Sequence, residues 1–147
     1  MEIRPANRDD LAAITECARL AYQPYVVRMG KKPAPMIADF AAQIADGIVH
    51  VATDDNGLGG FIVFYPRGDH LHLENVAVFP DRHGQGIGLN LIAFVEAAAE
   101  RDGCSAVELY TNEKMTENLT YYPRLGYREI SRGEQDGFNR VFYRKDI

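Results

Sequence analysis

The chain has 147 residues and a formal net charge of −5; hydrophobic residues make up 46% of it and charged residues 25%. This length and composition are typical of a single globular domain, here 1–147, and exclude a disordered or fibrous chain. The acidic balance gives no support to nucleic-acid binding, and no apolar run approaches the ~20 residues that cross a bilayer. We therefore expect a soluble protein with no nucleic-acid or membrane partner.

The cysteine content points to a reducing compartment. Cys17 and Cys104 lie far apart in the chain, which fits two free buried thiols better than a disulfide framework. The residues after Met1 contain no signal-like apolar stretch. The sequence predicts a cytoplasmic protein.

The first half of the chain predicts two helices and four strands. A short strand at 2–6 is followed by a helix that begins at Asp9 or Asp10 and ends near Tyr22. Prolines and Gly30 predict an irregular loop over 23–35. The remaining elements are a helix over 36–45, strands at 48–53, 59–65 and 70–79, and a hairpin turn at 54–57.

The second half completes a mixed α/β (α+β) domain. Its expected elements are a helix over 86–101, a strand at 106–110, a helix over 114–125, and strands at 127–131 and 138–144 around a turn at 133–137. We expect one central sheet of about seven strands, mixed but mostly antiparallel, flanked by four helices.

The most informative stretch is a glycine-rich loop that leads into the third long helix. Gly84, Gly86 and Gly88 stand at every second position, so the backbone can turn tightly and bring its N–H groups against a bulky anion. The helix that follows adds its positive N-terminal end and has no carboxylate in its first turn. This pattern predicts an anion cradle that suits a pyrophosphate.

Two familiar phosphate motifs do not fit this loop. A nucleoside triphosphatase loop needs a Lys and a Ser or Thr after its last glycine, where Leu89 and Asn90 stand. A dinucleotide fingerprint needs a third glycine where this chain has Leu89. A glycine-rich turn that only joins a strand to a helix also accounts for the segment taken alone.

Two separate motifs resemble those of the GNAT superfamily of acyl-CoA-dependent N-acyltransferases. In its acyl-CoA signature a Gln or Arg precedes a Gly-x-Gly/Ala pair; Gly86 and Gly88 match the glycines, and His83 departs from the Gln/Arg. In the second signature, residues 118–127, Tyr122 stands four residues before a Gly-Tyr pair. The resemblance covers nearly the whole order of elements and implies a GNAT-like fold with acetyl-CoA as co-substrate.

The resemblance also implies where the co-substrate lies. The fourth strand is expected to splay from the fifth, and the pantetheine arm to bond to its backbone, with an N–H near Val76 polarising the thioester carbonyl. The asparagine that the family usually has seven residues before its tyrosine falls on Met115 here, so Asn112 is the expected substitute. The implied cofactor contacts are Val76, Ala77, Val78, His83, Gly84, Gln85, Gly86, Ile87, Gly88, Asn112 and Asn118.

Acyl transfer to an amine needs a proton acceptor and a proton donor. By resemblance Tyr122 is the general acid, and an ordinary tyrosine pKa near 10 keeps it protonated at neutral pH; a tyrosine simply packed on the sheet is the alternative. His70, His72 and Glu74 share one strand face. We expect Glu74 to be the base or amine-binding carboxylate, with His72 next. A solvated strand face and a Zn²⁺ site are the alternatives, and no metal is expected.

The sequence thus predicts an acetyl-CoA-dependent N-acetyltransferase that acts by direct transfer in a ternary complex. The acceptor is a primary amine on a small molecule, a peptide or a protein, and Tyr22, Tyr25 and Arg28 are candidate pocket residues. A non-catalytic acyl-CoA binding or sensing module is the alternative; the joint presence of Tyr122 and Glu74 favours the enzyme. Edge strands near the C-terminus offer a surface on which two copies can pair as a homodimer.

Overall fold

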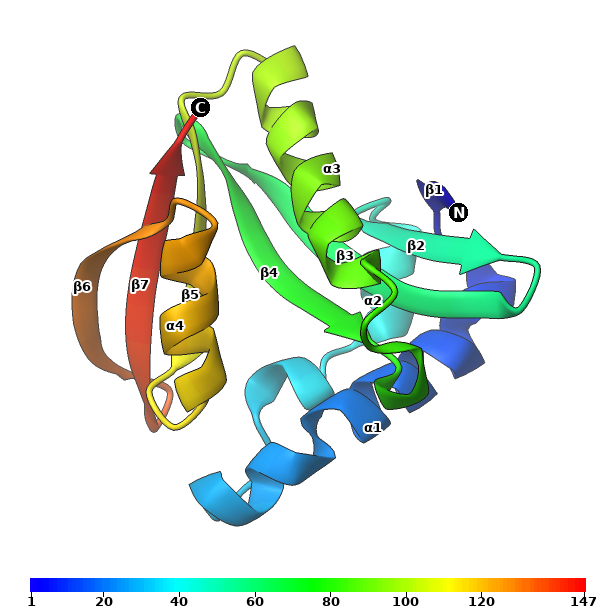
Figure 1. Cartoon of the computed structure of the whole chain (residues 1–147), viewed down its shortest axis with the longest axis horizontal. Coiled ribbons are helices and arrows are strands. Elements are labelled where there is room, and N and C mark those ends of the chain that lie inside the picture. Colours follow the sequence, from blue (N-terminus) through cyan, green and yellow to red (C-terminus); the bar gives the residue numbers. More distant parts are fainter.

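The computed structural model describes all residues, 1–147, and is built around one seven-stranded sheet. The strand order is β1-β2-β3-β4-β5-β7-β6, and every neighbouring pair is antiparallel except β4 and β5 (Figure 1). The strands are β1 (Glu2–Pro5), β2 (Val49–Asp54), β3 (Gly57–Arg67), β4 (His70–Val78), β5 (Ala106–Asn112), β6 (Arg128–Gln135) and β7 (Phe138–Asp146). The predicted mixed, mostly antiparallel sheet is confirmed.

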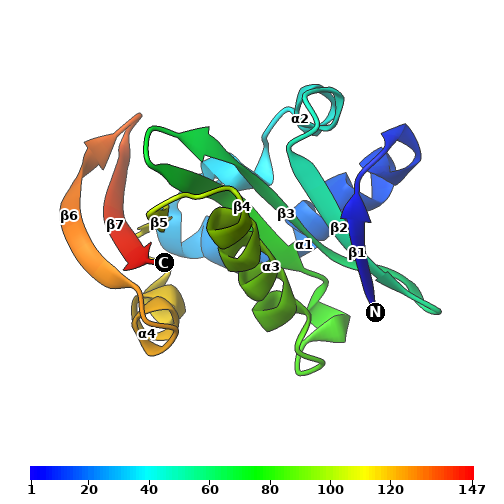
Figure 2. The same cartoon turned by 90° about the horizontal axis from the view of Figure 1, so that it is seen from above.

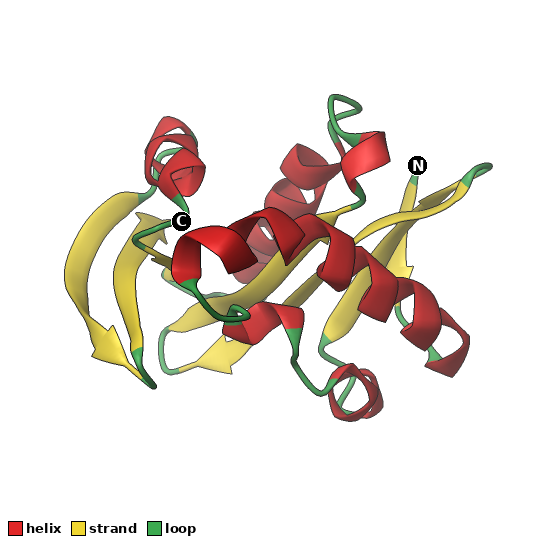
Figure 3. Ribbon diagram, turned by 90° about the horizontal axis from the view of Figure 1, so that it is seen from below, coloured by secondary structure: helices red, strands yellow, loops and turns green.

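Four α-helices cover the two faces of this sheet, as predicted (Figure 2; Figure 3 gives the opposite view). Helices α1 (Leu11–Met29) and α2 (Phe40–Ala45) pack on one face, and α3 (Ile87–Arg101) and α4 (Thr116–Arg124) on the other. Three short 3-10 turns complete the chain: η1 (Arg8–Asp10), η2 (Ala34–Met36) and η3 (Pro80–Arg82). None of the helices has the length and apolar character that a bilayer crossing requires.

Each long helix buries one apolar stripe against the sheet. On α3 the buried positions Leu91, Val95 and Ala99 recur every four residues, and on α1 Ile14, Cys17 and Ala18 form the equivalent stripe. Burial raises the pKa of the Cys17 thiol to about 12, so this cysteine is a core residue and not a nucleophile at neutral pH.

The sheet divides in its middle, between β4 and β5. In this parallel pair, only His70–Leu73 of β4 are joined to Ala106–Leu109 of β5. Beyond these residues the two strands diverge (Figure 1). Beyond that point β4 stays paired with β3 and β5 stays paired with β7. Two strand edges with unpaired backbone groups therefore face each other across a wedge, and the expected splay is confirmed.

A β-bulge in β4 sits at the point where the wedge opens. Val63 of β3 pairs with Asn75 and Phe64 pairs with Leu73, which leaves Glu74 as the extra residue. The bulge shifts the alternation, so that Asn75 contacts α1 although Glu74 remains beside His72. The side chains of the two neighbouring polar residues, Glu74 and Asn75, therefore both lie on the α1 side of the sheet where the wedge opens.

The predicted irregular loop over 23–35 is wrong for its first part, because α1 continues through Pro24 to Met29. Tyr22 hydrogen-bonds to Asn75 of β4, and Arg28 forms an ion pair with Glu117 of α4. These tertiary contacts hold the last turns of α1 in place against the local cost of the proline. Gly30, with φ 71°, then ends the helix.

Among the other boundaries, two differ most from the prediction. The second helix begins at Phe40 and not at Met36, because the Asp39 side chain caps it by accepting from the N–H of Ala42 at 3.1 Å. Strand β6 runs on to Gln135, and the turn is a tight one at Asp136 and Gly137, both with positive φ. Because β6 is exposed along its whole length, no burial pattern marks it in the sequence. Homodimer pairing through this edge stays a prediction.

Candidate active site

The wedge between β4 and β5 opens into a cavity of about 770 Å³, which we call the central cleft. Its walls come from the second half of α1, the free part of β4, the loop before α3, the end of β5, and α4. This volume lies in the range of small-molecule and cofactor sites. The candidate residues of the sequence analysis line it, with the exceptions of Gln85, Arg28 and His72.

The glycine loop forms one end of the central cleft. Gly84 and Gly86 adopt φ values of 82° and 79°, a left-handed backbone that favours glycine. The first helical bond of α3 runs from the N–H of Asn90 to the carbonyl of Gly86, so the N–H groups of the preceding turn have no helical partner. With no acidic residue in that turn, the backbone fits a bulky anion.

The side chains before the loop contribute less than the resemblance implies. The His83 imidazole is exposed, and its backbone N–H already bonds to the carbonyl of Pro80 at 3.3 Å. The Arg82 guanidinium is paired with Asp54 and donates to Gln85 at 2.9 Å. The anion cradle is therefore formed mainly by glycine N–H groups and the end of α3.

Strand β4 forms the floor of the central cleft. Val76 and Val78 lie on its free section and pack on the α3 side, whereas Ala77 is buried toward α1. The carbonyl of Val76 accepts a hydrogen bond from the Tyr22 hydroxyl at 3.2 Å. The Tyr22 hydroxyl also donates to Asn75 at 2.6 Å, which fixes α1 against the strand.

Tyr122 reaches the central cleft from α4. Its ring packs against Tyr127 and Tyr143 with centroids 5.8 and 6.1 Å apart, and the residue is 7% exposed. The hydroxyl makes no hydrogen bond within the protein. Burial, with smaller contributions from neighbouring phenols, raises the pKa of Tyr122 well above its ordinary value. This hydroxyl is therefore a protonated, unengaged donor at neutral pH.

Tyr121, its neighbour, points elsewhere. Its hydroxyl lies 3.9 Å from the place where a Cβ on Gly88 would stand, so it borders the anion cradle. Adjacent tyrosines thus serve two different parts of the central cleft.

Glu74 and His72 form a hydrogen-bonded pair where the wedge opens. The Oε2 of Glu74 lies 2.7 Å from the Nε2 of His72, and the hydroxyls of Tyr65 and Tyr110 donate to the carboxylate at 3.4 Å each. The bond to His72 lowers the pKa of Glu74 below its ordinary range, against the opposing effect of burial. Glu74 is thus an ionised carboxylate near neutral pH.

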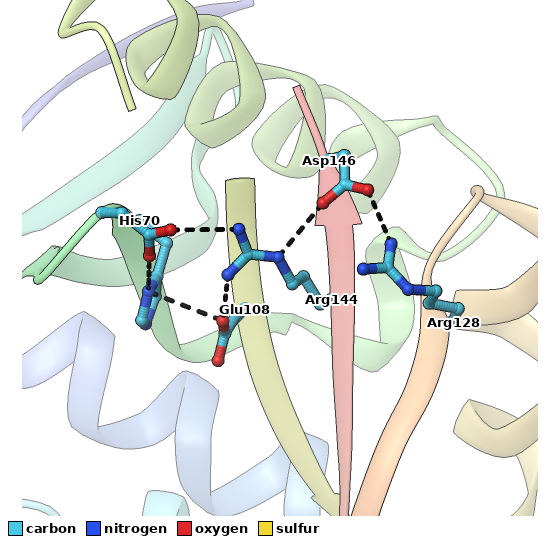
Figure 4. Close-up of polar contacts among 6 residues, drawn as sticks. His70, Glu108, Arg128, Arg144 and Asp146 are labelled. Carbon is cyan, nitrogen blue, oxygen red and sulfur yellow. Dashed lines mark hydrogen bonds and ion pairs between the residues drawn. The ribbon is translucent and has the colours of Figure 1, made fainter. Parts of the chain in front are cut away.

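The side chains of His70, His72 and Glu74 do not converge on a common ligand point. The ring of His70 bonds to Asp69 at 3.0 Å and lies 3.5 Å from Glu108. The guanidinium of Arg144 lies among these donors, 2.6 Å from Glu108 (Figure 4). A cation is therefore already supplied to this carboxylate cluster by the protein itself.

The two candidate asparagines line the central cleft but have local partners. The Asn112 side chain accepts from the N–H of Lys114 at 2.9 Å, and Asn118 donates to Thr111 at 3.0 Å. Met115, at the family's asparagine position, is buried beneath them. Their contact with a co-substrate stays a prediction.

The candidate pocket residues on α1 divide into two groups. Tyr22 and Tyr25 line the central cleft, whereas Arg28 lies outside it. Tyr25 and Arg28 both bond to Glu117, at 3.1 and 2.7 Å, and tie α1 to α4 across the wedge. Arg28 therefore holds the two walls together in this structure.

Several residues at the site carried no sequence signal that we used. Asn75, Tyr110 and Arg140 line the central cleft, and Tyr65 contacts Glu74. They come from four strands, β3, β4, β5 and β7, and only the register of the sheet brings them together. The bulge that redirects Asn75 has no signature in a single sequence.

Comparison with known proteins agrees with this geometry. A family model described as an acetyltransferase (GNAT) domain matches residues 45–129, more than half of the chain. The chain belongs to the GNAT family. The match covers β4, the glycine loop, α3, β5 and α4, which are the elements around the central cleft.

Two curated GNAT-like relatives are N-acetyltransferases. The chain is 32% identical over 99 residues to an aminoalkylphosphonate N-acetyltransferase of Salmonella typhimurium, over 61% of this chain and 64% of that one. It is 33% identical over 78 residues to a thialysine N-epsilon-acetyltransferase of Sus scrofa, over 53% of this chain and 46% of that one. The aligned region spans less than two thirds of each relative.

A solved structure shows the same fold over nearly the whole GNAT domain. The PaiA N-acetyltransferase from Thermoplasma acidophilum, in complex with coenzyme A, superposes with a TM-score of 0.78 at 18% identity. The alignment covers 99% of this chain and 98% of that one.

Proposed function

We propose that this GNAT protein transfers the acetyl group of acetyl-CoA to a primary amine, by direct attack in a ternary complex. The observation that carries the proposal is that the Glu74 carboxylate and the free Tyr122 hydroxyl open on one cleft, which ends at an anion cradle. Support also comes from the N-acetyltransferase relatives and from the coenzyme A bound to the PaiA protein.

On the co-substrate side, the backbone of the glycine loop receives the pyrophosphate. The residues proposed to hold acetyl-CoA are those of the free section of β4, the loop and the end of β5 with α4: Val76, Ala77, Val78, His83, Gly84, Gln85, Gly86, Ile87, Gly88, Asn112 and Asn118. A backbone N–H near Val76 stabilises the oxyanion, because a fixed donor needs no reorganisation as charge develops.

Proton movements are divided between two groups. Glu74 receives the substrate ammonium, and one proton leaves to solvent through Glu74 and His72, directly or by a water. The free amine attacks the thioester carbon; the carbon–sulfur bond then breaks, and Tyr122 gives its proton to the departing thiolate. The second proton of the attacking nitrogen restores Tyr122, so the reaction releases one proton overall.

The acceptor is proposed to be an amine on a small molecule, a peptide or a protein, bound beside Tyr22 and Tyr25. Both tyrosines line the central cleft, as Glu74 does. The two thiols, free in the structure, support the proposal that the protein works in the reducing cytoplasm.

A two-stage experiment tests this function. Thermal melting is measured with acetyl-CoA, free CoA and NAD; a ligand at a hundredfold excess over its Kd stabilises the native state by ~2.7 kcal/mol. Release of free thiol is then measured with a panel of primary amines. We expect a shift with both CoA forms but not with NAD, and amine-dependent thiol release. Binding without transfer to any amine would favour a non-catalytic acyl-CoA module, and absence of any shift would overturn both.

A further inference from the structure

A second cavity adjoins the central cleft on the α1 side of the sheet. It has a volume of about 410 Å³, and we call it the side cavity. Glu74, Leu109, Tyr110 and Arg140 line both cavities, so the two meet at these side chains. A molecule in the side cavity can therefore reach the proposed point of acyl transfer.

Arg140 is the unusual residue of this junction. It is 7% exposed. Arg140 and Asp10 are the two buried residues among the Asp, Glu, Lys and Arg side chains of the chain. Asp10 is compensated by Arg4 in a two-pronged ion pair, at 2.8 and 3.0 Å. For Arg140 the nearest carboxylate is that of Asp136, at 3.8 Å, and the Asp136 side chain is 79% exposed. A buried cation without a close counter-charge is costly, which points to a missing partner.

The other charges around the side cavity are accounted for. Glu74 bonds to His72, and Glu108 bonds to Arg144 at 2.6 Å. Arg67 lies at the exposed rim, where water hydrates its charge, and donates to Tyr65. Arg140 alone combines burial with an incomplete set of partners.

The unused donors of Arg140 face the cavities. A guanidinium has five N–H donors, and the one hydrogen bond of the Arg140 side chain runs to the Gln135 side chain at 2.6 Å. None of its nitrogens is among the fully enclosed polar atoms without a partner. Its remaining N–H groups therefore reach open space, in the two cavities that the residue lines.

Aromatic rings fix the orientation of this guanidinium. Its central carbon lies 4.1 Å from the ring centroid of Tyr110 and 5.6 Å from that of Phe138. Stacking of this kind leaves the in-plane N–H groups free to grip a planar or tetrahedral anion. The Tyr110 hydroxyl in turn bonds to Glu74, so one ring separates a fixed cation from a fixed anion.

We propose that the acceptor is an amine that also carries an anionic group, a carboxylate, phosphonate or sulfonate, which Arg140 binds while Glu74 receives the ammonium. This inference rests on the proposed acetyl transfer and names the class of its acceptor. The anionic group of the acceptor would face the Arg140 guanidinium on one side of Tyr110, and its ammonium would face the Glu74 carboxylate on the other. A dication or a neutral amine would leave Arg140 without a partner.

Matched pairs of amines test the proposal on the wild-type protein. The ω-amino acids from glycine to 6-aminohexanoate are compared with their carboxamides, and 2-aminoethylphosphonate and taurine with propylamine. We expect kcat/KM for the best acidic amine to exceed that of its neutral counterpart by about 10- to 100-fold, as for a charge-assisted hydrogen bond. A ratio of one or less in every pair would overturn the proposal.

Two variants of Arg140 and one control variant locate the effect. In Arg140→Gln we expect the acidic-to-neutral ratio of kcat/KM to fall toward one, mainly through a higher KM for the acidic amine. Arg132→Gln removes the same charge from an exposed position paired with Glu129 and is expected to keep the wild-type ratio. Arg140→Lys, which keeps the charge but loses the planar fork, is expected to lie between them and serves if the glutamine variant fails to fold. An unchanged ratio in both Arg140 variants would overturn the role of this residue.

A binding measurement separates this inference from the proposed function. With CoA-saturated protein, we expect the acidic amines to raise the melting temperature more than their neutral counterparts do. Acetyl transfer that prefers neutral amines would overturn the acceptor class and leave the proposed function intact. Absence of transfer to any amine, with acidic amines still bound preferentially, would overturn the proposed function and support the anion site.

Discussion

The carboxylate of Glu74 and the imidazole of His72 are 2.7 Å apart on one strand, at the point where the sheet divides. Strand alternation places both side chains on one face, and the bulge at Glu74 shifts the alternation only for the residues after it. The bond to His72 holds the pKa of Glu74 below its ordinary value of 4.5. Glu74 is thus suited to bind a substrate ammonium and to pass its proton on through His72.

Replacement of Glu74 by Gln is expected to lower kcat by about 10²- to 10⁴-fold, the usual contribution of a general base. The amide keeps the shape but can neither attract an ammonium nor accept its proton. Acetyl-CoA binding, measured by thermal melting, is expected to stay at the wild-type level, because Glu74 is not part of the anion cradle. A variant that binds acetyl-CoA and keeps full activity would show that Glu74 is not the base.

Removal of the His72 ring is expected to shift the acidic limb of the pH–rate profile. Because the hydrogen bond from His72 is the largest cause that lowers the pKa of Glu74, His72→Gln raises that pKa, and activity is lost at a higher pH. The bond also stabilises the folded state at pH values above 4.5, and this contribution disappears as pH falls through the lowered pKa. His70→Gln is the control, since His70 contacts Asp69 and not Glu74. An acidic limb at the same pH in both variants would contradict the assignment of this limb to the Glu74–His72 pair.

The adjacent tyrosines of α4 are expected to fail in different ways. Tyr122→Phe removes the proposed proton donor and should lower kcat by about 10²-fold or more with little change in acetyl-CoA affinity. Tyr121→Phe removes a hydroxyl beside Gly88 and should raise the KM for acetyl-CoA with kcat nearly unchanged. Steady-state kinetics with varied acetyl-CoA separates the two outcomes. Equal losses of kcat in both variants would contradict the choice of Tyr122 over Tyr121.

The sequence predicted the elements whose signals are local. Alternating apolar residues marked β2, β3 and β4, and Gly84, Gly86 and Gly88 marked the turn into α3. The end of α1 could not be predicted, because Pro24 argues locally for a loop and the helix is held by Tyr22 and Arg28 through partners on β4 and α4. In this segment the tertiary contacts outweigh the low helix propensity of Pro24.

The site shows the same division between local and long-range information. His72 and Glu74 are two residues apart, so their common face was predictable from strand alternation. Arg140 meets Tyr110 only because β7 pairs with β5 in one register, and Asn75 faces α1 only because of the bulge. Pairing across the sheet is set by the whole fold, and single-chain spacing does not encode it.

Close packing of Gly60 in β3 against β4 and α3 predicts a sharp difference between two glycines. A Cβ on Gly60 would stand 2.7 Å from the backbone oxygen of Ala77 and 3.2 Å from the Ile87 side chain. Gly60→Ala is therefore expected to destabilise the fold by about 1–3 kcal/mol, as overpacking does. Gly133→Ala, with nothing within 4 Å, is the control and should be neutral. Urea denaturation midpoints measure both, and equal midpoints would contradict the close approach.

Arg144 of β7 joins the turn between β3 and β4 to β5 and to the end of its own strand, and it is expected to stabilise the fold in a pH-dependent way. Its guanidinium bonds to Asp69, Glu108 and Asp146 at 3.2, 2.6 and 3.1 Å (Figure 4). Hydrogen bonds to His70 and Arg144 lower the pKa of Asp69, so this contribution is present above its ordinary value of 3.8 and lost as pH falls through the lowered one. Arg144→Met should therefore lower the melting temperature at pH 7, and the difference from wild type should shrink toward pH 3.

Salt dependence separates this ion network from simple packing of the Arg144 stem. Screening weakens interactions between charges near the surface, so the loss in Arg144→Met should be smaller at 1 M salt than at low ionic strength. Arg101→Met is the matched control, because Arg101 is 69% exposed and pairs only with its neighbour Asp102. Its melting temperature should stay at the wild-type value, since an exposed pair contributes little. A loss in Arg144→Met that is the same at every pH and salt concentration would assign the effect to packing of the side chain and not to its charge.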